Sequence, residues 1–167
     1  ALVGNKNSYG VWYMIDLDKI LLELETLPKY DTQIALQTVE GWDWIDWAWY
    51  KRADNTSDDI LPEHLDVTNF VIPAFDIPYI NSILKELGMV GSRVMTLLPS
   101  TCYSYHKDDT KRIHIPIVSN EKCFMIVDGV AINYPADGNY YVVDTTKMHT
   151  ALNGSSEDRL HIVGIIV

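Results

Sequence analysis

From residue 93 onward the chain consists of short runs of β-branched and aromatic residues separated by turn residues. Asp-Gly pairs at 128–129 and 137–138 are typical of the tight turns that join antiparallel strands. The runs are RVMTLL (93–98), CYSYH (102–106), RIHIPIV (112–118), CFMIV (123–127), YYVVD (140–144) and RLHIVGIIV (159–167). Six strands at this spacing predict a β-sandwich or barrel.

Two helices are predicted ahead of these strands. Residues 12–27 repeat apolar side chains at helical spacing and stop before Pro28. Residues 76–88 do so more regularly, with Asp76 placed to cap the first turn and Gly88 where helices commonly end. The first half of the chain therefore reads as a helical part that flanks a β core.

Four of the five tryptophans lie between the two predicted helices. They are Trp42, Trp44, Trp47 and Trp49. Large aromatic side chains at alternating positions either cover one end of a small β core or line a pocket for a peptide or a sugar. The first interpretation is favoured, and the second stays open.

Length and composition favour one domain. The chain has 167 residues, 47% of them apolar, and no Gly/Ser-rich or Pro-rich linker. We expect a single domain over 1–167, in which 1–90 form the helical, Trp-rich flanking part and 91–167 form the core that carries the site. A net charge of −10 disfavours binding to nucleic acid through a basic face.

The cysteine count and the lack of long apolar segments indicate a cytoplasmic protein. Cys102 and Cys123 are too few for a disulfide framework, and they could pair only if their strands are neighbours. No signal peptide and no apolar run of membrane-spanning length is present in this sequence. We therefore expect a reducing compartment and no membrane partner.

Two His-x-Asp triplets are candidate metal-ligand pairs, at His106–Asp108 and at His64–Asp66. Such a triplet is a short motif that also arises by chance. On a strand, residues two apart point to the same side, so Cys102, Ser104, His106 and Asp108 would share one face. The second triplet lies in an acidic, Pro-flanked segment that is typical of a surface loop, and we interpret it as chance.

The spacing between a later histidine and an arginine favours the first triplet. A mononuclear Fe(II) site with two histidines and one carboxylate needs a third ligand, and it leaves positions open for a co-substrate and O₂. His149 follows the 140–144 run, and ten residues later Arg159 begins the last run. No other histidine of the chain has an arginine at that spacing.

These residues resemble the pattern of the Fe(II)/2-oxoglutarate-dependent oxygenases: His106, Asp108, His149 and Arg159. More narrowly, RIHIPI followed by MHTALNGSSEDRLHIV looks like the aspartyl/asparaginyl β-hydroxylase branch, of which short members also occur in phages. The resemblance covers about residues 93–167, and the first half shows no motif. It implies a double-stranded β-helix, also called a jelly-roll, of the cupin-like kind.

The resemblance implies roles for individual residues. His106, Asp108 and His149 would bind Fe(II), and Arg159 would hold the far carboxylate of 2-oxoglutarate, since a guanidinium fork matches a carboxylate. Arg112 and His114 would lie beside the metal-bound end of the co-substrate. A solvent-facing Arg112 and His114 remain open as alternatives. So does a structural ion pair of Arg159 with Asp144, Glu157 or Asp158.

The implied reaction converts 2-oxoglutarate and O₂ to succinate and CO₂ and hydroxylates a prime substrate. Some relatives lack the carboxylate ligand, and halogenating relatives use the vacated position for chloride. Asp108 retains the full ligand set, which favours hydroxylation. Asp109 would point to the opposite face of a regular strand.

Two other functional classes remain possible for a jelly-roll. One is a zinc-dependent or metal-free small-molecule binder, although the cupin type would need a His-x-His pair followed by a Glu, which this chain lacks. The other is an interaction module that uses the tryptophans as its contact surface. For an oxygenase, the prime substrate is either a protein or peptide side chain or an amino-acid-like small molecule.

Overall fold

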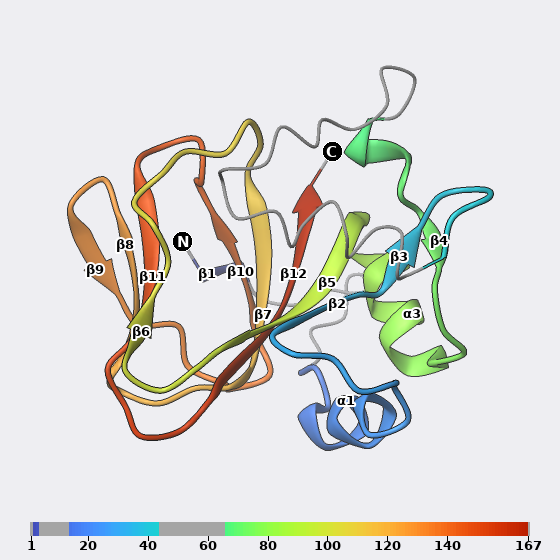
Figure 1. Ribbon diagram of the computed structural model, residues 1–167, viewed down its shortest axis with the longest axis horizontal. Coiled ribbons are helices and arrows are strands. Elements are labelled where there is room, and N and C mark those ends of the chain that lie inside the picture. Colours follow the sequence, from blue (N-terminus) through green and yellow to red (C-terminus); the bar gives the residue numbers. More distant parts are fainter. Residues whose placement is uncertain (1, 4–13, 44–65, 167) are drawn as a thin grey trace.

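Two antiparallel β-sheets face each other, and two helices cover the outer face of the larger one (Figure 1). The computed structural model describes residues 2–3, 14–43 and 66–166. The larger sheet has the order β1 (Leu2–Val3), β10 (Tyr140–Val143), β7 (Arg112–Val118), β12 (Arg159–Ile166), β5 (Met89–Leu97) and β2 (Gln33–Ala35). The smaller sheet has the order β6 (Thr101–Cys102), β11 (His149–Asn153), β8 (Cys123–Val127) and β9 (Val130–Ile132).

The chain crosses repeatedly between the two sheets. From β5 to β12 successive strands alternate between the larger and the smaller sheet, except at β8 and β9, which form a hairpin within the smaller one. Asp128 and Gly129 join them with φ values of 52° and 79°, as a two-residue hairpin turn requires. This alternation is that of a double-stranded β-helix, so the jelly-roll prediction is confirmed.

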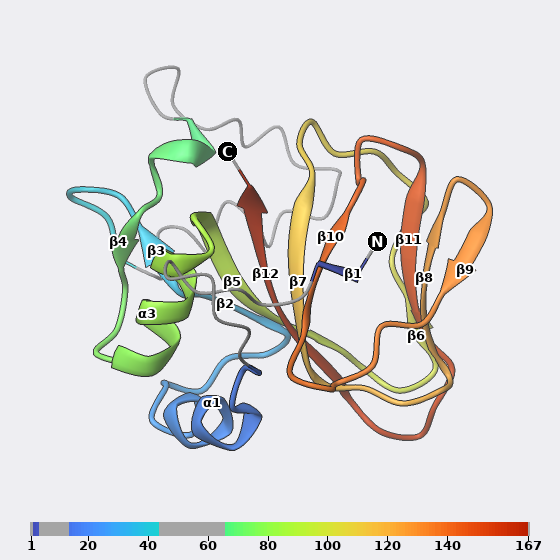
Figure 2. The same cartoon turned by 180° about the vertical axis from the view of Figure 1, so that it is seen from behind.

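The two α-helices of the described residues lie on the side of the larger sheet that faces away from the smaller one (Figure 2). They are α1 (Leu17–Leu24) and α3 (Pro78–Glu86). Both are amphipathic, and Ile20 of α1 and Ile80, Ile83 and Leu84 of α3 are buried. These side chains pack in one cluster with residues such as Val94, Ile113 and Ile162 of the larger sheet.

The two faces of the larger sheet differ in chemistry because side chains alternate along each strand. The outer face belongs to the aliphatic core under the helices. The inner face meets the smaller sheet through a second apolar cluster of Leu97, Met125, Val143 and Ala151. Polar inner-face residues of β5, β7 and β12 are therefore enclosed between the two sheets, where the cavity described below lies.

Both helix predictions are confirmed in place, with shorter bounds. Trp12 lies outside the described residues, and α1 begins after Asp16, whose carboxylate accepts from the Lys19 amide. Asp76 does not cap α3, so that prediction is wrong. Glu23 of α1 serves instead, because its two carboxylate oxygens accept from two amides in the first turn of α3, each at 2.8 Å.

The strand predictions fail where the chain is short or irregular. Residues 102–106 do not form one strand, since β6 ends at Cys102 and His106 forms only an isolated bridge, so the predicted alternation of Cys102, Ser104, His106 and Asp108 does not hold. The first half adds β1 and β2 to the larger sheet, and a small pair, β3 (Gln37–Thr38) and β4 (Ile72–Pro73), beside the 3₁₀ helix η1 (Val67–Asn69). The strands β9 and β11 were also not predicted.

Three other expectations concern the periphery of the fold. Trp42 packs edge-on against Phe70, with ring centroids 5.9 Å apart, as the core interpretation expects; Trp44, Trp47 and Trp49 lie outside the described residues. Both cysteines are free, and β11 separates their strands. Within the described ranges, no helix is long and apolar enough to span a membrane.

Candidate metal centre and its cavity

Backbone pairing holds His106 and His149 side by side. The His106 amide donates to the His149 carbonyl at 3.0 Å, and the His149 amide donates back at 2.8 Å. Two residues further on, the Asp108 amide donates to the Thr145 carbonyl at 2.8 Å. The irregular segment that carries His106 and Asp108 is thus fixed to the start of β11 and to the loop before it, although it lacks strand geometry.

Each histidine directs its Nε2 atom toward Asp108. Nδ1 of His106 lies 2.7 Å from the Ser104 carbonyl, and Nδ1 of His149 lies 2.9 Å from the Lys147 carbonyl. Because a carbonyl oxygen only accepts, each Nδ1 carries the proton and donates. The Nε2 lone pairs are therefore free, which is the arrangement found in metal-binding histidines whose other nitrogen is held by a carbonyl.

The three side chains have the geometry of a metal site. The Nε2 atoms lie 3.7 Å (His106) and 3.9 Å (His149) from oxygens of Asp108, and the potential ligand atoms lie within 4.8 Å of one another. Ligands at about 2.1 Å from an ion, at right angles, are about 3 Å apart, so a small closure would suffice. Two imidazoles and one carboxylate with open positions fit non-haem Fe(II).

Arg112 orients the carboxylate of Asp108. Its Nε donates to Oδ2 of Asp108 at 2.9 Å, while Oδ1 lies on the His106 side. Burial by itself would raise the pKa of Asp108, but the hydrogen bond and charge of Arg112, together with His149 and His106, outweigh it, and the pKa is lowered. The carboxylate is thus kept ionised and available to a cation. Asp109 is exposed and lies outside this group.

Arg112 and His114 both lie on the inner side of β7, which answers the alternative of a solvent-facing pair. The Arg112 side chain is largely buried, and His114 is buried and lines the same cavity. Nδ1 of His114 lies 3.3 Å from Nδ1 of His161, a buried neighbour on β12. Burial first, and then the charges of the nearby arginines, hold the pKa of His114 well below its usual range.

Arg159 enters the cavity from β12 and is only 3% exposed. Its Nη2 lies 3.0 Å from Nδ1 of His161. The described residues provide no ion pair to Arg159, so the expected alternative of a structural salt bridge is not observed with Asp144, Glu157 or Asp158. Burial lowers the pKa of Arg159 to about 10. A guanidinium buried in this way favours a negatively charged ligand.

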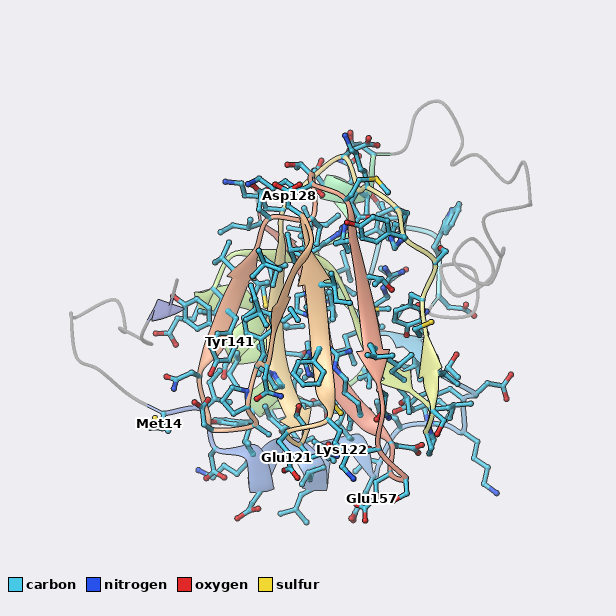
Figure 3. The ribbon with its side chains drawn as sticks, turned by 90° about the vertical axis from the view of Figure 1, so that its left-hand side faces the viewer. Met14, Glu121, Lys122, Asp128, Tyr141 and Glu157 are labelled. Carbon is cyan, nitrogen blue, oxygen red and sulfur yellow. The ribbon has the colours of Figure 1, made fainter. Side chains whose placement is uncertain are left out.

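The triad and Arg159 line one cavity between the sheets, with an empty volume of about 510 Å³ that is partly open to solvent. Figure 3 shows the smaller sheet face-on, with Asp128 at one end and Glu157 at the other. The triad lies near Asp128, because β11 pairs His149 with Val127. Arg159 lies two residues after Glu157, so the cavity extends from the triad toward the opposite end of the sandwich.

Sequence reasoning missed several lining residues. Arg93, Met95, Tyr103, Met125 and Thr145 line the cavity together with the expected residues. The sequence could have indicated Arg93, because strand alternation places it on the same face of β5 as Met95 and Leu97. Those two apolar side chains point inward, so Arg93 does too. The sequence gave no such indication of Tyr103, since its segment is not a regular strand.

The second triplet is only partly described. His64 lies outside the described residues, as does Leu65. Asp66 accepts from the Thr68 amide at 2.8 Å and caps η1, which accounts for its side chain without a metal. Its interpretation as chance therefore stays a prediction.

A family model described as aspartyl/asparaginyl beta-hydroxylase matches residues 16–165. The chain belongs to this family. The match confirms the resemblance and extends it beyond the motif-bearing 93–167, since it begins at the residue that caps α1. The match therefore includes most of the helical part, in which the sequence shows no motif.

Several solved structures are similar to this family member at low identity. A prolyl-4-hydroxylase of Pseudomonas putida is 16% identical, covering 92% of this chain and 95% of its own, with a TM-score of 0.36. A cupin domain of Bordetella pertussis is 12% identical, covering 46% and 79%, with a TM-score of 0.40. The plu4264 protein of Photorhabdus luminescens is 13% identical, covering 46% and 62%, with a TM-score of 0.39, so the chain spans less than two thirds of its length. None of the curated proteins compared matches the chain.

Proposed function

We propose that this protein is a non-haem Fe(II)- and 2-oxoglutarate-dependent oxygenase. It hydroxylates a protein or peptide side chain, or an amino-acid-like molecule, and releases succinate and CO₂. The main support is the pair of free Nε2 lone pairs directed at the Asp108 carboxylate. Membership of a hydroxylase family also supports this activity.

His106, Asp108 and His149 would hold Fe(II), which supplies the activation of O₂. The carbonyls of Ser104 and Lys147 fix the ring tautomers, and Arg112 fixes the carboxylate. Such outer contacts keep ligands in place while a metal binds and exchanges its other partners. The half-exposed His106, opposite a buried His149, leaves an access side for a substrate.

Arg159 would bind the carboxylate of 2-oxoglutarate that lies far from the metal. Its guanidinium is buried without a carboxylate partner among the described residues, and His161 Nδ1 holds it from one side. Met95, Met125 and Val163 line the cavity with apolar atoms, which exclude water from the bound co-substrate. A dry site strengthens the pairing of the two charged groups.

The test is formation of succinate from 2-oxoglutarate in air by the Fe(II)-loaded protein. We expect slow turnover even without a prime substrate, and loss of it when Fe(II) is omitted or when His149→Ala removes one ligand. The control is Thr146→Ala, an exposed position whose hydroxyl donates to Asp144. Metal and 2-oxoglutarate binding without succinate formation would contradict the proposal and favour a binding protein.

A further inference from the structure

Beside the proposed co-substrate site lies a buried histidine, His161, which does not itself line the cavity. It follows Arg159 by two residues on β12, so the two side chains share the inner face of the larger sheet. On the neighbouring strands it lies opposite Met95 of β5 and Pro116 of β7. Its exposed fraction is 0%, so it can influence a ligand only through a neighbour.

One nitrogen of His161 accepts two hydrogen bonds. Nη2 of Arg159 lies 3.0 Å from His161 Nδ1, and a guanidinium can only donate, so Nδ1 is the acceptor. Nδ1 of His114 lies 3.3 Å from the same atom, so the proton between the two rings is carried by His114. The proton of neutral His161 is then on Nε2. The directions of the two bonds therefore assign one tautomer to each ring.

The bond to His161 fixes the orientation of Arg159. Within the part of the chain that the structure describes, it is the one hydrogen bond of the Arg159 side chain. Because a guanidinium is planar, with its donors in fixed directions, engaging Nη2 sets the plane in which the remaining donors lie. Those donors are available to a ligand in the cavity that Arg159 lines. A side chain aligned before binding loses less conformational freedom on binding than a free one.

Packing alone does not account for a histidine at this position. Nε2 of His161 is buried and has no hydrogen-bond partner among the described residues. An unpartnered buried donor is unfavourable and rare, and an apolar side chain would avoid it. Burial, and then the charges of Arg159 and His114, hold the pKa of His161 well below its ordinary range, so the ring is neutral and Nδ1 keeps its lone pair. The acceptor role of Nδ1 does account for the residue.

We propose that His161 is a positioning residue that aligns the Arg159 guanidinium and so sets the selectivity of this protein for a 2-oxo acid with a second carboxylate. This inference rests on the proposed function, in which Arg159 holds that carboxylate. A 2-oxo acid that ends in a methyl group offers Arg159 no partner, so His161 contributes nothing to its binding. The effect of His161 is therefore a change in the ratio of two affinities, and not a general loss of binding.

Three substitutions separate the acceptor from the rest of the ring. His161→Leu removes both nitrogens from the buried position. His161→Asn keeps an acceptor, because its Oδ1 stands as far along the side chain as Nδ1 does. His161→Gln moves the acceptor one atom further, to the level of Nε2, and is the matched control for His161→Asn. Circular dichroism and thermal unfolding of each variant show whether the fold is retained.

Calorimetry on the Mn(II)-loaded protein compares 2-oxoglutarate with 2-oxopentanoate, which has the same carbon chain and a methyl group in place of the far carboxylate. Both ligands share the 2-oxo acid end, so a disturbance of the metal side cancels in the ratio of their Kd values. The wild type should prefer 2-oxoglutarate by about thirtyfold or more, as expected for a buried charge pair.

The variants should divide into two groups. His161→Leu and His161→Gln should lower the preference by about tenfold, as expected when a long side chain must be ordered on binding. Their Kd for 2-oxopentanoate should stay within about threefold of the wild-type value. His161→Asn should keep the preference itself within about threefold, because the acceptor for Nη2 of Arg159 is retained.

Each other outcome overturns the inference. Equal weakening of both ligands by His161→Leu would show a purely structural role, and an unchanged preference in that variant would show no role. A loss in His161→Asn as large as that in His161→Gln would contradict the acceptor role, and this comparison decides the question if His161→Leu does not fold. A wild type that binds neither Mn(II) nor 2-oxoglutarate contradicts the proposed function itself, and the inference falls with it.

Discussion

At the scale of single residues, the neighbouring carboxylates Asp108 and Asp109 distinguish a metal site from an acidic turn. Asp108 is half-buried and lies between the two histidine Nε2 atoms, whereas Asp109 is exposed. We expect Asp108→Ala to abolish succinate formation and to weaken Mn(II) binding, because a methyl group cannot replace a ligand. Asp109→Ala should change either quantity little, since exposed substitutions rarely matter.

The pair of variants also checks the register of this irregular segment. Each is measured for succinate formation and for Mn(II) affinity, with thermal unfolding as a test of folding. An inactive Asp109→Ala with an active Asp108→Ala would place the ligand one residue later. Loss of activity in both variants with unchanged metal affinity would assign the metal to other residues.

Arg159 offers a second residue-scale prediction. Arg159→Ala should raise the apparent KM for 2-oxoglutarate strongly, because truncating one partner of a buried charge pair costs about 2–5 kcal/mol. Arg159→Lys should recover only part of the affinity, since an ammonium lacks the planar fork. Metal binding should survive, because Arg159 lies outside the triad.

Measuring both affinities on one sample separates the explanations for Arg159. Joint loss of Mn(II) and 2-oxoglutarate binding would indicate misfolding. Unchanged 2-oxoglutarate binding would contradict its role and assign the far carboxylate to another cation of the cavity.

At the scale of elements, β12 carries a buried histidine whose protonation is coupled to folding. Burial first, and then the charges of Arg159 and His114, hold the pKa of His161 well below its ordinary 6.5. The unfolded chain takes up a proton as the pH falls below about 6.5, while the folded chain does not. Stability from this group is therefore complete above that pH and is lost as the pH falls below it.

The prediction is a pH-dependent difference between the wild type and His161→Asn. Below pH 6.5 the wild type should lose up to about 1.4 kcal/mol of unfolding free energy per pH unit more than the variant. Urea unfolding at several values between pH 7.5 and pH 5 measures it. Parallel pH profiles for the two proteins would show that His161 is not kept neutral in the fold.

The contact between α1 and α3 gives another element-scale prediction. Glu23 accepts hydrogen bonds from the amides of Tyr79 and Ile80, and so replaces the cap that Asp76 does not provide. Glu23→Ala should lower the unfolding free energy by about 1 kcal/mol, as loss of a helix cap does. Glu25→Ala is the matched control, because Glu25 is an exposed carboxylate directly after the same helix. Equal effects of the two substitutions on the denaturation midpoint would argue against the capping role.

At the scale of the whole molecule, the sequence predicts the strands whose pattern is local. The runs from 112 and from 123 contain enough alternating or apolar residues to mark β7 and β8 with correct bounds. The strands β1 and β2, of two and three residues, are too short to show such a pattern. Their place in the sheet comes from pairing with distant strands. The irregular segment after β6 is shaped by bonds to β11 and its preceding loop, so local alternation misjudged it.

The same distinction between local patterns and long-range contacts explains which site residues could be predicted from the sequence. The triad and Arg159 stand at spacings that the sequence displays. The position of Arg93 beside His114 depends on β5 and β7 both pairing with β12, which only the sheet order reveals. The cap from Glu23 likewise joins residues 56 positions apart.

The most direct test of the central account is a crystal structure of the protein with Mn(II) and 2-oxoglutarate. The account predicts one ion bound by Nε2 of His106, Nε2 of His149 and a carboxylate oxygen of Asp108, at about 2.0–2.2 Å. It also predicts that 2-oxoglutarate reaches from this ion to the Arg159 guanidinium. An ion held by other residues, or a co-substrate whose far carboxylate lies away from Arg159, would contradict it.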